Sequence, residues 1–127
     1  MSAKHKEIIE KVNKGFENND VEAFLGFCAD DIQWQMAGDQ PKNGKESIRE
    51  WIKSVPDMGP PKINTTAIIS EGNSAACYGD MTMKEKGEEN FYSFCDIYRF
   101  AGDKIVELRS FAVKEKPEGE SQRSATA

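Results

Sequence analysis

The chain has 127 residues, 38% hydrophobic and 31% charged, which suits one domain with a modest core. A formal net charge of −5 with scattered Lys and Arg argues against nucleic-acid or anionic-membrane partners. No apolar run approaches the roughly 20 residues that span a bilayer, and the start "MSAKHKEIIEK" is too charged for a signal peptide. We therefore expect a cytoplasmic protein.

Three helices are expected in the first half of the chain. Apolar residues on one helical face predict a helix over residues 3–17. Asp20 is a suitable N-cap for a second helix, which the sequence "ADD" (residues 29–31) ends. Asn43 and Glu46 resemble a capping box for a third helix over Lys45–Lys53. The side chains expected to be buried are Ile8, Ile9, Val12 and Phe16, then Phe24, Leu25 and Cys28, then Ile48, Trp51 and Ile52.

Strands account for most of the remainder. Residues 32–36 alternate apolar and polar side chains, so Ile32, Trp34 and Met36 should share one face. Three or four more strands, drawn from residues 63–70, 74–86, 90–100 and 104–114, follow as an antiparallel meander. Helices gathered on one side of an antiparallel sheet make an α+β domain over residues 1–113, and the polar tail 114–127 should be flexible. A bent sheet closed by helices leaves a cone-shaped cavity for a small ligand.

One acid, Asp96, interrupts the apolar strand "NFYSFCDIYRF". A buried carboxylate is costly unless it is paired or protonated. A turn at Gly87-Glu88 would place Asp96 opposite Gly79, where the missing side chain leaves space beside the carboxylate. We expect Asp96 to face the cavity. An exposed Asp96, or one paired with a neighbouring arginine, is the alternative, although Arg99 points to the opposite face.

The remaining candidates follow from the same alternation of faces. The predicted ligand-binding residues are Trp34, Met36, Trp51, Cys77, Gly79, Met81, Met83, Tyr92, Phe94, Tyr98 and Leu108. Ser110 should also face inward, and the same aromatic and methionine side chains could instead simply fill a core. The one histidine, His5, is expected to be exposed rather than catalytic. The three cysteines, Cys28, Cys77 and Cys95, lack metal-ligand spacing and should be small core residues, so neither metal nor cofactor is expected.

The segments "CADDIQWQMAGDQPKNGKESIREW" and "CDIYRFAGDKIVELRSF" resemble the SnoaL-like and ketosteroid isomerase branch of the nuclear transport factor 2-like superfamily. The resemblance implies a cone-shaped fold, a deep apolar cavity and often a homodimer formed through the outer sheet face. It aligns Asp96 with the isomerases' protonated oxyanion donor. The isomerase base aligns with Met36, its oxyanion tyrosine with Val12, and two supporting tyrosines with Cys28 and Ile52. Steroid isomerisation by the family's mechanism is therefore not expected.

Two functions stay open from the sequence. The first is a cofactor-independent isomerase, cyclase or lyase that acts on a small lipophilic molecule. Asp96 would be its acid or oxyanion donor, supported by Tyr92 or Tyr98. The second is a non-catalytic ligand-binding module or dimeric scaffold.

Overall fold

The structure, a computed structural model, describes residues 2–54 and 60–115. The helices are α1 (Ser2–Glu17), α2 (Val21–Leu25) and α3 (Lys45–Lys53). The strands are β1 (Cys28–Met36), β2 (Lys42–Asn43), β3 (Lys62–Glu71), β4 (Ser74–Glu85), β5 (Glu88–Ala101) and β6 (Lys104–Lys114). The predicted α+β class is confirmed. Most of the predicted tail lies outside the described residues.

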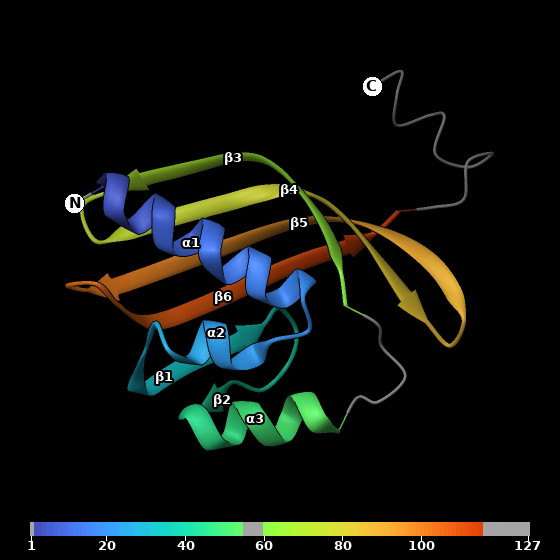
Figure 1. Cartoon of the computed structure of the whole chain (residues 1–127), viewed down its shortest axis with the longest axis horizontal. Helices are drawn as coiled ribbons and strands as arrows, with labels where there is room; N and C mark the ends of the chain where they lie inside the picture. Colours follow the sequence, from blue (N-terminus) through green and yellow to red (C-terminus); the bar gives the residue numbers. More distant parts are fainter. Residues whose placement is uncertain (1, 55–59, 116–127) are drawn as a thin grey trace.

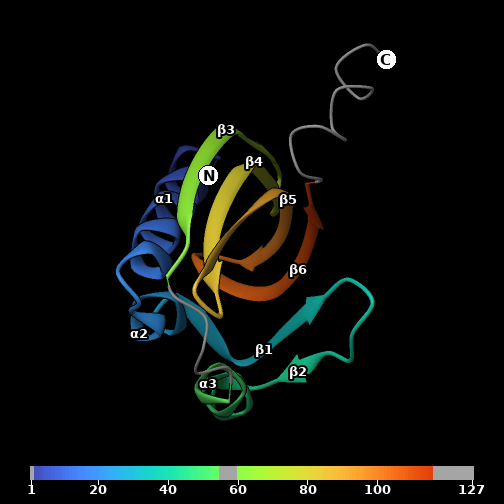
Figure 2. The ribbon, with the colours of Figure 1, turned by 90° about the vertical axis from the view of Figure 1, so that its right-hand side faces the viewer.

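The six strands form one curved, open sheet in the order β2-β1-β6-β5-β4-β3 (Figure 1). The meander β3–β6 is antiparallel, as predicted. The sheet as a whole is mixed, because β1 pairs with β6 in parallel. This pairing joins the first and last strands of the domain, and no local sequence pattern predicts it. Figure 2 shows how strongly β3–β6 curve, with α1 alongside β3 and α3 below β1 and β2.

Most of the side chains that the helical periodicity assigned to the core are buried, whereas Phe16, Trp51 and Ile52 are half-buried. Ile8, Ile9 and Val12 of α1 are fully buried against the inner face of the sheet. The N-cap prediction is confirmed, since the Asp20 carboxylate accepts a hydrogen bond from the Ala23 amide at 3.3 Å. Among the described helices, none combines the length and apolar character that crossing a bilayer requires.

Two helix boundaries differ from the prediction. The second helix ends at Leu25, so "ADD" lies within β1 and does not terminate a helix. The capping box is wrong, because Gly44 is the N-cap of α3 at φ 87° and makes no side-chain cap. Asn43 instead belongs to β2, where its side-chain oxygen accepts a hydrogen bond from Gln33 at 3.1 Å.

His5 is buried, which contradicts the expectation that it is exposed. The first turn of α1 packs against the end of β5, where the imidazole stacks on Phe100 with ring centroids 4.0 Å apart. Its Nε2 lies 2.9 Å from the Gly102 carbonyl oxygen, and it donates a hydrogen bond there. The ring therefore has a structural role at the end of the sheet. Cys28 and Cys77 are buried as predicted, whereas Cys95 is half-buried.

The predicted pairing register of β4 with β5 is wrong, because the turn between these strands lies one residue earlier than expected. Lys86 and Gly87 occupy the turn with positive φ angles of 54° and 84°, which is typical of a two-residue type I′ hairpin. Asp96 therefore pairs with Cys77, and Gly79 pairs with Phe94. Because the shift is two residues and the side-chain period of a strand is also two, every residue keeps its predicted face.

Gly79 has a different role from the one predicted. A Cβ atom at this position would lie 2.1 Å from the Asn64 carbonyl oxygen of β3. The β3–β4 register shifts at this point, between Thr65 and Ala67. Gly79 is therefore required for the close approach of a bulged β3, and it does not hold space open beside Asp96.

Candidate functional site

A cavity of about 570 Å³ lies between the helices and the inner face of the sheet. Its walls come from all three helices and from the strands β1, β3, β4, β5 and β6. Most of the lining side chains are aromatic rings, thioethers and branched aliphatic groups. Seven of the predicted residues line it: Trp34, Met36, Trp51, Met81, Met83, Phe94 and Asp96. Ser110 also lines it, as its strand face implied. This volume falls within the usual range for sites that bind small molecules.

Four predicted residues lie elsewhere within the core. Cys77, Tyr98 and Leu108 are fully buried in the hydrophobic core and do not line the cavity. Gly79 faces the backbone of β3. The alternation of side chains along the strands predicted the correct face of the sheet. How far the cavity extends along that face depends on the packing of α1, which the alternation does not predict.

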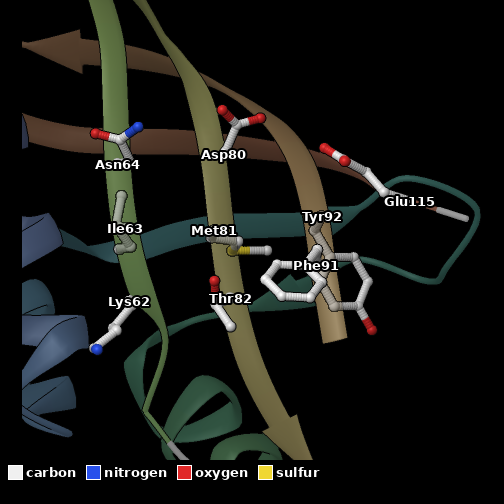
Figure 3. Close-up of a pocket in the computed structure, with 9 residues that line it drawn as sticks. All are labelled: Lys62, Ile63, Asn64, Asp80, Met81, Thr82, Phe91, Tyr92 and Glu115. Atoms are coloured by element: carbon white, nitrogen blue, oxygen red, sulfur yellow. The ribbon is translucent and has the colours of Figure 1, made fainter. Parts of the chain in front are cut away.

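Tyr92 lines a second depression, shown in Figure 3, which is formed by β3, β4, β5 and the residue after β6. Its hydroxyl donates a hydrogen bond to the Glu85 carboxylate at 2.5 Å. That bond is the main reason that the pKa of Tyr92 is raised to about 12. The Tyr92 hydroxyl is thus occupied by Glu85 and does not support Asp96. Nor does Tyr98, whose buried hydroxyl has no hydrogen-bond partner among the described residues.

Asp96 lines the cavity, half-buried, between its cross-strand neighbours Cys77 and Ser110. Burial raises the pKa of its carboxyl to about 6, and hydrogen bonding by the Ser110 hydroxyl acts in the opposite direction. At pH 7 about one carboxyl in ten is therefore protonated. The carboxylate therefore predominates at neutral pH, and the neutral acid implied by the resemblance is the minor form.

Neither neighbouring arginine pairs with Asp96. Arg99 donates to Glu107 at 2.9 Å, and the Arg109 guanidinium lies 5.6 Å from the centre of the Phe111 ring. No ion pair in the described part of the chain involves Asp96. The carboxylate therefore faces an apolar space without a counter-charge.

Two polar groups beside Asp96 are held by internal hydrogen bonds. The Trp34 indole N–H donates to the Ser110 hydroxyl at 2.9 Å. The Asn13 amide nitrogen lies 3.5 Å from both the Thr65 hydroxyl and the Cys77 sulfur, in donor geometry. Sequence analysis missed Asn13. Its position four residues after Ile9 and three before Phe16 was the available signal, since it puts a polar group on the apolar stripe of α1.

Aromatic side chains make up much of the cavity wall. Trp34 contacts Trp51 edge to face, with ring centroids 5.2 Å apart, and Phe16 lies on its other side at 5.8 Å. Lys53 of α3 also borders the cavity and is exposed. Within residues 2–54 and 60–115, no three His, Cys, Asp or Glu side chains lie close enough together to hold a metal ion.

Residues 9–108 match the SnoaL-like domain. The chain belongs to this family. This SnoaL-like domain is similar to an NTF2-like protein of unknown function from Burkholderia pseudomallei, at 17% identity and a TM-score of 0.79, covering 98% of both chains. Among curated proteins, none is similar enough in sequence to match.

Two further structures resemble the SnoaL-like domain in fold. An LEH-like epoxide hydrolase from M. tuberculosis shares 12% identity at a TM-score of 0.77, covering 87% of this chain and 84% of that one. A putative SnoaL-like polyketide cyclase from Jannaschia shares 10% identity at a TM-score of 0.77, covering 98% and 91%. At these identities the likeness establishes the nuclear transport factor 2-like fold alone.

Proposed function

We propose that this SnoaL-like domain binds a small lipophilic molecule in its cavity and places the molecule's polar group at Asp96. The observation that carries the proposal is one acid facing an apolar space of about 570 Å³. Aromatic and thioether walls supply affinity through burial of apolar surface, and one polar group fixes the orientation of the ligand.

Asp96 is also suited to acid–base chemistry. A catalytic group transfers protons best when its pKa lies near the working pH, and burial brings the pKa of Asp96 to about 6. One such group contributes about 10²–10⁴-fold, enough for an isomerase, cyclase or lyase reaction on a substrate with a labile proton. Two proteins of the same fold, named as an epoxide hydrolase and a putative polyketide cyclase, are enzymes by name.

A non-catalytic binding module is the second candidate. Met36 lines the cavity at the position where the isomerases carry their base, and a thioether does not accept a proton at neutral pH. The other ionisable lining residues in the described chain, Asp20 and Lys53, are exposed. Asp96 would then orient a ligand without transforming it.

Native mass spectrometry of freshly purified protein tests the binding proposal. We expect a small molecule to co-purify, and Met81→Trp to abolish its retention because the larger side chain occupies the cavity. Tyr78→Trp, on the outer sheet face, is the matched control and should keep the molecule. Retention of the molecule by Met81→Trp would place it outside the cavity and refute the proposal.

We also propose that the outer face of the sheet forms a homodimer interface. Its exposed apolar side chains, with exposed fractions in parentheses, are Val113 (69%), Ile69 (58%), Phe91 (55%), Ile97 (41%) and Tyr78 (40%). Exposed apolar patches of this kind mark interaction surfaces.

Light scattering after size exclusion should give a dimer for the wild type and a monomer for Ile97→Glu. Asn18→Asp, an equal charge change on the helical side, should remain dimeric, and a monomeric wild type would refute the interface.

A further inference from the structure

The polar groups around Asp96 differ in whether their hydrogen-bonding capacity is already used. The donors are occupied, since the Trp34 indole N–H is bonded to Ser110, the Ser110 hydroxyl is bonded to Asp96, and the Asn13 amide nitrogen is directed at Thr65 and Cys77. The acceptors are the Asp96 carboxylate and the Asn13 amide oxygen, and both residues line the cavity. A ligand placed here is therefore met by acceptors and must itself donate.

The charges around Asp96 also favour a ligand that donates hydrogen bonds. The polar groups around Asp96 are its cross-strand neighbours Cys77 of β4 and Ser110 of β6, Asn13 of α1 and Trp34 of β1, which hydrogen-bond to those two, and Tyr98 on its own strand. None of them carries a positive charge. The thiol of Cys77 and the phenol of Tyr98 are acids whose pKa values are raised, so they stay neutral at pH 7. The one described lining cation, Lys53, lies exposed on α3.

The aromatic wall favours a cation as well. Phe16 and Trp34 stack on the cavity wall with ring centroids 5.8 Å apart, whereas the ring of Trp51 already has the Lys42 ammonium group over it, 5.7 Å from its centroid. The face of an aromatic ring attracts an ammonium group, most strongly where water is excluded. The chain's net charge of −5 adds a weak long-range attraction for cations.

We propose that the ligand is a lipophilic amine, whose ammonium group pairs with the Asp96 carboxylate and donates to Asn13, and whose hydrocarbon part lies between the aromatic side chains. This inference rests on the proposed function, because it names the class of molecule that the same cavity binds. A carbonyl compound would need a donor, and only the protonated minority of Asp96 offers one.

Three probes with one carbon skeleton test the proposal: 4-phenylbutan-2-amine, 4-phenylbutan-2-ol and 4-phenylbutan-2-one. The amine is a cationic donor, the alcohol a neutral donor and acceptor, and the ketone an acceptor only. Isothermal titration calorimetry gives the Kd of each between pH 5 and pH 7.5. An aliphatic amine with a pKa of about 10 stays protonated throughout this range, so any change with pH comes from the protein.

We expect the amine to bind at least about tenfold more tightly than the ketone at pH 7.5, a difference of about 1.4 kcal/mol. Its Kd should rise about tenfold between pH 7.5 and pH 5, because a carboxyl with a pKa of about 6 is then only about one-tenth ionised. Asp96→Asn should weaken the amine about tenfold and leave the ketone within about twofold. Asp80→Asn, which removes an equal charge from the exposed outer face, should change neither.

Other results would overturn the inference and separate it from the proposed function. Tighter binding of the ketone, increasing as the pH falls, would show that Asp96 acts as a neutral donor, while the cavity remains a ligand site. If Asp96→Asn bound the amine as tightly as the wild type does, the amine inference would be rejected, but the cavity would remain a proposed ligand site. Absence of binding by all three probes to the wild-type protein would reject both proposals.

Discussion

Replacing Asp96 with asparagine should stabilise the protein at neutral pH. Folding raises the pKa of this carboxyl from 3.8 to about 6, so folding favours the protonated form. The folded state is therefore penalised progressively as the pH rises from about 4 to about 6, and the penalty is constant above that range. A difference of about two units at about 1.4 kcal/mol each sets its upper limit near 3 kcal/mol.

The carboxyl keeps contact with the cavity, where water can solvate it in part, so about 1–3 kcal/mol is expected for Asp96→Asn at pH 7.5. Asparagine has nearly the shape of the neutral acid, so the two proteins should be equally stable near pH 3.5. Equilibrium urea unfolding across this pH range measures the difference. Asp80→Asn controls for the loss of one charge. Stability of Asp96→Asn equal to or below wild type at pH 7.5 would refute the account of Asp96 as an unpaired acid.

Two further changes test the packing around the site. Gly79→Ala should lower the free energy of unfolding by more than about 2 kcal/mol, because its Cβ would overlap the Asn64 carbonyl oxygen at 2.1 Å, and a cost below about 1 kcal/mol in urea unfolding would contradict this. Tyr98→Phe should raise the melting temperature, since it removes a buried hydroxyl that has no partner among the described residues and whose burial costs about 1–3 kcal/mol. A lower melting temperature would mean that the hydroxyl is satisfied in solution.

The sequence predicted the features that depend on local periodicity. A helical period placed Ile8, Ile9 and Val12 in the core, and a strand period placed Asp96 on the face that lines the cavity. The hairpin register was missed by two residues, because Lys86-Gly87 rather than Gly87-Glu88 forms the turn. Because the register was wrong by two residues, which is one side-chain period of a strand, Asp96 stayed on its predicted face and only its cross-strand partner changed.

Features that depend on distant parts of the chain were missed. The parallel pairing of β1 with β6 and the burial of His5 against Phe100 join residues far apart in sequence. Asn13 was overlooked, although its spacing from Ile9 and Phe16 places it on the apolar stripe of α1. Tyr92 and Tyr98 share a face with Asp96, but the Tyr92 hydroxyl donates to Glu85 and Tyr98 is fully buried in the core. The roles of these two tyrosines could be assigned only from the residues that surround them in the fold.

The hydrogen bond from Trp34 to Ser110 spans 76 positions of sequence. During translation, the ribosome releases β1 long before β6, the strand that carries Ser110 and lies beside Asp96. The wall of the cavity therefore cannot be complete in a partly synthesised chain that has not emerged through β6. Contacts this distant also slow folding, so the apolar side chains of the inner sheet face stay exposed to water until β6 has paired with β1 and β5.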